Sequence, residues 1–166
     1  MTRPRFSDAW AASLRIYDRD NSAARVAEVI GGYVARNINN PNPSQRWENT
    51  CAVRMSYILG EAGMVLPAMR GKTVSGADKR QYFFRVRDLI AFLTRQWGKP
   101  EVVDHPASGG GPLAGRQGLI LFEVSGWDDA LGHATLYDGI ACYDNCYFNE
   151  PGAKYRTDRA NFWSLN

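Results

Sequence analysis

The sequence predicts an α+β fold in which helices come first along the chain and a mostly antiparallel sheet follows. Between breaks that contain glycine and proline, apolar residues recur at helical spacing as far as Trp97. After Gly118 they form short runs rich in aromatic and β-branched residues, a pattern typical of strands. Helices followed by strands favour the α+β class. The chain has 166 residues and no internal repeat, so we expect a single domain over residues 1–166.

Four helices are expected in the first part of the chain. They run from Ser7 to Tyr17, from Ser22 to the Gly31-Gly32 pair, from Asn49 or Thr50 to Gly63, and from Val86 to Trp97. Within the first helix, Trp10, Leu14 and Tyr17 share one face, which we expect to be buried.

Three strands are expected in the second part, over Leu119–Val124, Leu131–Tyr137 and Ile140–Tyr143. The segment before them, His105–Gly118, contains three consecutive glycines and two prolines. We expect this segment to be an exposed, mobile loop.

The last two expected strands form a hairpin around Asp138-Gly139. An Asp-Gly pair between two apolar runs indicates a two-residue type I′ turn, and in that register His133 faces Asp144. Directly opposed residues have Cβ atoms about 4.5–5.5 Å apart, so this imidazole and carboxylate can interact. Such a carboxylate orients the ring and leaves the other ring nitrogen free to act as a base.

A nucleophile for this pair is available in Cys51, which falls in the first turn of the third expected helix. The positive end of a helix dipole favours thiolate, and so does a neighbouring imidazolium. Backbone N–H groups at the same helix end can stabilise an oxyanion. A helix-start cysteine followed by His133 and Asp144 on a sheet is the order of papain-like hydrolases, so we predict nucleophilic catalysis by these three residues.

Each residue of this set also has a purely structural interpretation. A single cysteine is often a small buried apolar residue, a strand histidine is usually structural, and a His facing an Asp can be a favourable cross-strand pair. A metal site built from His133, Cys142 and Cys146 is disfavoured because C-x₃-C is a poor ligand spacing and no fourth ligand lies nearby in the sequence. We expect no metal and no cofactor.

Composition argues against several other classes of protein. The net charge is only +3, and the basic residues are scattered without a run of five or six, so nucleic-acid binding is not favoured. No apolar stretch is long enough to insert into a membrane. The N-terminus lacks the uninterrupted apolar region of a signal peptide, so we expect the chain to stay in the cytoplasm of the producing cell unless a dedicated machine exports it.

Three segments of the sequence resemble a known family. They are W-E-N-T-C-A-V-R-M-S-Y at residues 47–57, G-H-A-T-L at residues 132–136 and C-Y-D-N-C-Y-F at residues 142–148. Together, and in this order, they resemble the fourth family of type VI secretion amidase effectors. Those proteins are toxins injected into the periplasm of Gram-negative competitors, and they belong to the papain-like NlpC/P60 group.

This resemblance implies a fold, a reaction and partners. It implies Cys51 as nucleophile, His133 as general base and Asp144 as its orienting partner, together with a disulfide between Cys142 and Cys146. It implies a DL-endopeptidase that cleaves the bond between γ-D-glutamate and meso-diaminopimelate in peptidoglycan stem peptides. It also implies a cognate immunity protein that plugs the active site, and a component of the secretion tube that carries the effector.

Other assignments remain open at this stage. Gln45, Trp47 and Asn49 precede the cysteine and are candidates for substrate contact or oxyanion stabilisation, although Gln45 lies in a polar loop and Trp47 is equally suited to packing. The same triad can run acyl transfer, transglutamination or deamidation. A non-catalytic module that binds cell wall is a further alternative, although binding alone does not need a thiol at a helix start.

Overall fold

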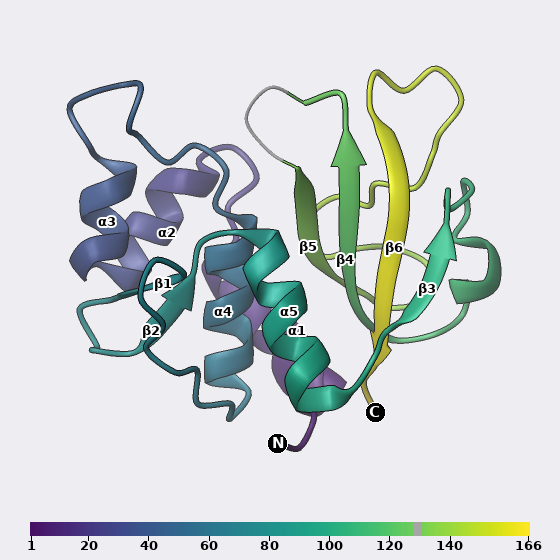
Figure 1. The fold of residues 1–166 in the computed structure, drawn as a ribbon, viewed down its shortest axis with the longest axis horizontal. Coiled ribbons are helices and arrows are strands. Elements are labelled where there is room, and N and C mark those ends of the chain that lie inside the picture. The colour runs from purple at the N-terminus through teal and green to yellow at the C-terminus, as the bar shows by residue number, and fades with distance from the viewer. Residues whose placement is uncertain (128–130) are drawn as a thin grey trace.

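The computed structural model describes residues 1–127 and 131–166 and confirms a mixed α+β fold with antiparallel sheets. Helices occupy one side of the molecule and a four-stranded sheet the other (Figure 1). In chain order the elements are α1 (Phe6–Ile16), α2 (Ser22–Ile30), α3 (Gly32–Ile38), α4 (Cys51–Glu61), β1 (Thr73–Ser75), β2 (Gln81–Phe83), α5 (Val86–Trp97), β3 (Glu101–Asp104), a 3₁₀ turn (Gly111–Leu113), β4 (Gly118–Ser125), β5 (Gly132–Tyr137) and β6 (Arg156–Ser164).

The main sheet has the strand order β3-β6-β4-β5, and every neighbouring pair is antiparallel. Strand β4 lies inside the sheet, where Leu119 is level with Leu136 of β5 on one side and with Trp163 of β6 on the other. Strand β5 is the last named strand on the side of the helices and contacts both α4 and α5 (Figure 1). Strands β1 and β2 form a separate short ribbon.

Side chains that alternate along β4 belong to two different apolar clusters, one on each face of the sheet. Leu119 and Leu121 are fully buried in the cluster shared with the helices, whereas Ile120 and Phe122 are fully buried in a second cluster that includes Phe148. Successive side chains of a strand point to opposite faces. The sheet is therefore covered on both faces, by the helices on one and by the connecting segments on the other.

The buried face of α1 differs from the predicted one. Leu14 is 65% exposed, whereas Ala9, Ala12 and Ser13 are fully buried. Helix α1 packs against α4, and its buried face combines these small residues with Phe6 and Ile16, which are 7% and 0% exposed. The buried Ser13 hydroxyl is satisfied by donating to the Trp10 carbonyl, 2.6 Å away.

The Gly31-Gly32 pair ends α2 as predicted, but α3 begins immediately after it and was not predicted. Both glycines have positive φ, at 63° and 57°, so they reverse the chain direction between two helices. A Cβ atom on Gly32 would lie 2.4 Å from the backbone of Gly76, which only glycine avoids. The close approach explains why glycine stands here, although the pair was interpreted only as a stop.

Two predicted strands are present and one is not. Strands β4 and β5 match the predictions, whereas the segment Ile140–Tyr143 has only one bridge, between Tyr137 and Cys142, and Ile140 is 90% exposed. Strands β3 and β6 were not predicted. The segment 105–118 is not exposed throughout, because its 3₁₀ turn buries Leu113 completely in the second cluster.

Four elements have their ends facing the same way, upward in Figure 1. These are the N-termini of α4 and α5, the C-terminal end of β4 and the start of β5. Within the described ranges, no helix is sufficiently long and apolar to cross a bilayer.

Candidate active site

Helix α4 begins at Cys51, one or two residues after the predicted start at Asn49 or Thr50. Thr50 is the N-cap, and the Asn49 side-chain oxygen accepts the Cys51 backbone N–H at 3.1 Å. A side-chain oxygen at this position satisfies one of the N–H groups that a helix start leaves unpaired. The thiol therefore sits at the positive end of the helix, and it is only 2% exposed.

His133 and Asp144 come together, but not in the predicted hairpin register. Tyr137 is level with Cys142 instead of Ile140, because the turn is longer: the Asp138 N–H donates to the Ala141 carbonyl at 3.0 Å. Asp138 also caps the turn, since its side chain accepts two backbone N–H groups at 2.8 Å.

The corrected register places Thr135 level with Asp144, and the Thr135 hydroxyl donates to Oδ1 at 2.6 Å. A register shift by an even number of residues keeps every side chain on its face of the sheet. His133 therefore still reaches Asp144 diagonally, with Nε2 2.9 Å from Oδ2. The contact is short, but it lacks the alignment of a hydrogen bond, so it acts as an ion pair in this conformation.

The Asp144 side chain is fully buried and stays charged because its partners are polar or cationic. The Thr135 hydroxyl and the Asn145 backbone N–H both donate to Oδ1, and Arg54 donates to Oδ2 at 3.0 Å. Burial raises the pKa of Asp144, but the charges and hydrogen bonds of His133, Arg54 and Thr135 outweigh it and hold the pKa below its ordinary value.

The pKa values of His133 and Cys51 are shifted in opposite directions. Burial lowers the pKa of His133, but Asp144 and the Cys51 thiol raise it overall to about 9. Burial raises the pKa of Cys51, but His133, Arg54 and the Ala134 backbone N–H outweigh this effect and lower it. A raised imidazole pKa beside a lowered thiol pKa favours a thiolate–imidazolium pair near neutral pH. Since Nε2 faces Asp144, Nδ1 is the ring nitrogen left for the sulfur.

Arg54 is the main residue that the sequence reasoning missed. It lies on α4 three positions after Cys51, so both side chains lie on one side of the helix. Its guanidinium is buried and donates to Tyr143 at 3.1 Å and to Asp144 at 3.0 Å. Its remaining hydrogen bonds go to Ser22 at 2.7 Å and Thr50 at 3.1 Å, and it stacks over the Tyr17 ring at 5.3 Å. The helical spacing from the cysteine was the signal that could have revealed it.

A disulfide brackets the carboxylate. Cys142 and Cys146 are bonded, with Cα atoms 5.3 Å apart, which confirms the pairing implied by the resemblance. Asp144 lies midway between them in the sequence, so the bond closes a five-residue loop around it. Cys51 is the free cysteine of the chain.

Comparison with known proteins identifies the family. The family model for type VI secretion system amidase effector protein 4, abbreviated Tae4, matches residues 47–163. The chain belongs to this family. Thus the resemblance seen in its three sequence segments is confirmed, and the chain is an amidase effector of the type VI secretion class. No curated protein sequence matches it significantly.

Solved Tae4 structures share the whole fold. In the Tae4–Tai4 effector–immunity complex from Enterobacter cloacae, Tae4 is 38% identical to this chain with a TM-score of 0.85, over 99% of this chain and 100% of the other. Tae4 from Salmonella typhimurium, in complex with Tai4 from Enterobacter cloacae, is 34% identical with a TM-score of 0.85, over 99% and 100% of the two chains.

A cleft of about 610 Å³ reaches Cys51 of this Tae4 chain from the side of α5. The residues that line it are Asn49, Cys51, Ala52, Phe84, Arg85, Val86, Arg87, Ile90, Glu123, Trp127, Leu131 and Gly132. His133 is not among them; it is 6% exposed, and its ring lies 4.7 Å from the Tyr147 ring. Cys51 therefore lines the cleft, and His133 lies behind its wall.

The three residues before Cys51 have different environments. Asn49 lines the cleft. Trp47 stacks on Phe84, with ring centroids 5.0 Å apart, and packs against the main core. Gln45 is exposed in a turn, where its N–H donates to the Asn42 carbonyl. Of the three, Asn49 has the position that the predicted substrate or oxyanion role requires.

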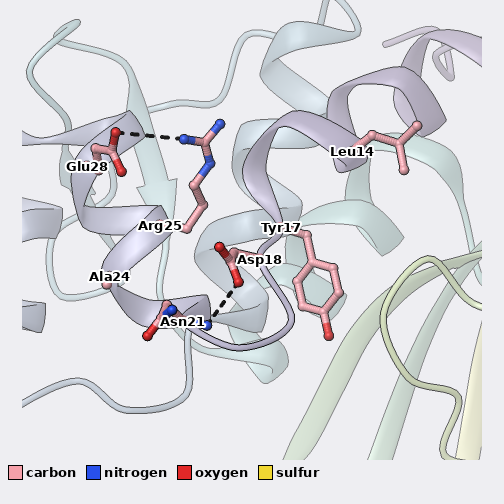
Figure 2. Close-up of a pocket in the computed structure, with 7 residues that line it drawn as sticks. All are labelled: Leu14, Tyr17, Asp18, Asn21, Ala24, Arg25 and Glu28. Carbon is pink, nitrogen blue, oxygen red and sulfur yellow. Dashed lines mark hydrogen bonds and ion pairs between the residues drawn. The ribbon is translucent and has the colours of Figure 1, made fainter.

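A second hollow, of about 530 Å³, lies between the end of α1 and α2 (Figure 2). Its polar groups are paired among themselves: Asp18 accepts the Asn21 N–H at 3.0 Å, and Arg25 pairs with Glu28 at 3.8 Å. Tyr17 lines this hollow and also contacts Arg54. Within the described residues, no group of three or more His, Cys, Asp or Glu side chains gathers that could hold a metal ion.

Proposed function

We propose that this effector is a papain-like cysteine amidase of the NlpC/P60 type that hydrolyses the γ-D-glutamyl–meso-diaminopimelate bond of peptidoglycan stem peptides. The observation that supports it most is the joint arrangement of a thiol at a helix start, an imidazole paired with a buried carboxylate, and opposite pKa shifts of thiol and imidazole. An amidase that uses a cysteine needs these features. The bond itself follows from the resemblance to the family.

The reaction has two steps. The Cys51 thiolate attacks the γ-carbonyl carbon of D-glutamate, and the carbonyl oxygen takes the negative charge. The imidazolium of His133 protonates the amino group of diaminopimelate, the C–N bond breaks, and a thioester remains on Cys51. A water molecule then loses its proton to His133 and attacks the thioester, which releases the free γ-carboxylic acid. Asp144 keeps the ring oriented throughout.

The negatively charged carbonyl oxygen needs a hydrogen-bond donor besides the backbone N–H groups at the start of α4. The Cys51 backbone N–H already donates to the Asn49 side-chain oxygen, so it is engaged before substrate binds. The side-chain amide of Asn49, which lines the cleft, supplies N–H donors of its own. We assign the oxyanion to this amide, assisted by the Cys51 N–H once Asn49 turns toward the substrate.

The biological setting follows from the family. Solved relatives are effector–immunity complexes of Tae4 with Tai4, and we expect a cognate immunity protein to bind this chain over the cleft. We expect a component of the secretion tube to carry the effector from the cytoplasm of the producer to the periplasm of the target cell. The Cys142–Cys146 disulfide suits that oxidising compartment.

Digestion of purified sacculi tests this function. We expect wild-type protein to release muropeptides cut between D-glutamate and diaminopimelate, with one new free amino group for each bond cut, as seen by mass spectrometry. Products coupled to an added amine acceptor, in place of free acids, would indicate acyl transfer. Binding to sacculi without new amino groups would indicate a wall-binding module. Either result would contradict the proposed hydrolysis.

A further inference from the structure

Three charged residues, Arg85, Arg87 and Glu123, line the cleft and take no part in the triad. Most of the wall is apolar and includes Phe84, Val86 and Ile90. Arg87, at the start of α5, and Glu123, near the end of β4, are of opposite charge and line the same cleft as Cys51. A mainly apolar site with a few placed charged groups is how proteins orient a small polar ligand.

Arg87 is available to a ligand, whereas its neighbour Arg85 is not. Arg85 pairs with Asp88 at 2.7 Å, stacks over the Phe84 ring at 5.0 Å and donates to the Gly71 carbonyl. Arg87 is exposed and, among the residues that the structure describes, has no hydrogen bond or ion pair. It also lies in the first turn of a twelve-residue helix, whose dipole favours a bound anion. Arg87 is therefore suited to a carboxylate.

Glu123 is fixed by a hydrogen bond from a buried neighbour on strand β6. Its Oε2 accepts the Asn161 side-chain amide at 3.1 Å, and Asn161 is 4% exposed and anchored by a second bond to the Leu121 carbonyl at 3.0 Å. Arg159 lies 3.7 Å from the same oxygen at the surface. The Glu123 side chain remains 44% exposed, and Glu123 lines the cleft, so its carboxylate is both fixed and accessible to a ligand. Glu123 is level with Gly132, next to His133 in the sequence, which brings it to the reacting end of the cleft.

We propose that Arg87 and Glu123 form a subsite for a free amino-acid centre, a carbon that carries both an ammonium and a carboxylate group. Glu123 binds the ammonium and Arg87 binds the carboxylate, while the apolar wall contacts the aliphatic chain that leads to it. This inference rests on the proposed function, in which the leaving residue is a diamino acid. The far end of diaminopimelate is such a centre when it is not cross-linked.

The subsite predicts a preference for substrates in which the far end of diaminopimelate is free. An acylated ammonium, as in a cross-link through that amine, loses its charge and its attraction to Glu123. A lysine in place of diaminopimelate keeps the ammonium and lacks the carboxylate that Arg87 binds. The effector is therefore expected to cut stems with a free diaminopimelate end faster than stems cross-linked through it.

Variants and matched substrates together test the subsite. The substrates are L-Ala-γ-D-Glu-diaminopimelate, the same tripeptide acetylated on the far amine, the tripeptide with lysine, and the tripeptide with an amidated D-glutamate α-carboxyl group. On the first, we expect Arg87→Gln and Glu123→Gln each to lower kcat/KM by about 10- to 100-fold, the usual range for loss of a charge-assisted hydrogen bond. The exposed residues Arg95 and Glu28 lie outside the cleft, so Arg95→Gln and Glu28→Gln serve as matched controls that leave kcat/KM unchanged.

The decisive result is how the loss of kcat/KM in each variant differs among the four substrates. Arg87→Gln should cause no further loss on the lysine tripeptide, and Glu123→Gln none on the acetylated one, because the wild-type protein has already lost the matching contact there. Equal losses on all four substrates would overturn the subsite. So would an Arg87 effect that disappears on the amidated glutamate, since Arg87 would then bind that residue. If wild-type protein cut none of the four, the proposed function would fail instead.

Discussion

Replacing Cys51 by alanine is expected to abolish hydrolysis of stem peptides while the protein stays folded. The sulfur is the atom that forms the thioester, and loss of a nucleophile in a comparable hydrolase lowers kcat on the order of 10⁶-fold. The fold should persist because Cys51 is a small buried residue whose backbone cap, the Asn49 side-chain oxygen, does not involve the sulfur. Release of soluble muropeptides from sacculi measures the activity.

The Cys51→Ser variant is measured in the same assay, because it keeps the size of the side chain and changes only the nucleophilic atom. Thermal unfolding of both variants checks that they fold like the wild type. Cleaved muropeptides from folded Cys51→Ala at a rate near that of wild type would show that the thiol is not the nucleophile.

Replacing Arg54 by methionine is expected to reduce both activity and stability. Arg54 and Asp144 form an ion pair whose side chains are 7% and 0% exposed, and removal of one partner of a buried pair typically costs about 3–5 kcal/mol. Without the guanidinium, Asp144 and the ring it orients lose a fixed support. A displacement of reacting groups by about 1 Å can cost on the order of 100-fold in rate, and we expect a loss of that size in kcat/KM.

The pH profile separates this role from simple loss of stability. The positive charge of Arg54 helps to lower the pKa of Cys51, so its removal raises that pKa. Activity that requires thiolate then begins to rise at a higher pH, and the acidic limb of kcat/KM against pH moves upward. The basic limb should remain, because His133, whose pKa is about 9, must still hold a proton to protonate the leaving amine.

Two further variants control the Arg54 result. Arg156, which is 70% exposed in a surface pair, provides a matched arginine, and Arg156→Met should change neither activity nor the pH profile. In the Asp144→Asn background, Arg54→Met should cost much less stability than it does alone, because the charge that it neutralises is absent. An unchanged acidic limb in folded Arg54→Met would show that Arg54 has a structural role only.

Local sequence signals were sufficient to predict α4, which carries the nucleophile, and α5, which lines the cleft. The apolar spacing after Cys51 predicted α4 within two residues at its start, and α5 was predicted with its observed bounds of Val86 and Trp97. Helix starts and stops depend on nearby residues, so they can be seen in a sequence.

Features that depend on distant residues were missed or predicted for the wrong reason. The His133–Asp144 contact was predicted from a two-residue turn; the real turn is longer, and the contact persists because the register shifts by an even number of residues. Arg54 has its partners on two other segments, at Ser22 and at the adjacent residues Tyr143 and Asp144. Strand β6 gains its place by pairing with both β3 and β4. The spacing of Arg54 from Cys51 is visible in the sequence, but its partners and the strand pairings leave no local pattern.

Detection of an acyl-enzyme decides whether Cys51 is the nucleophile of the reaction. Wild-type protein is mixed with an excess of L-Ala-γ-D-Glu-diaminopimelate and quenched in acid at short times, and its intact mass and peptide map are measured beside the released product. We expect an added mass of one L-Ala-γ-D-Glu acyl group, carried by the peptide that contains Cys51 and absent from Cys51→Ala. An acyl group on any other residue, while product forms at the normal rate, would contradict this role of Cys51.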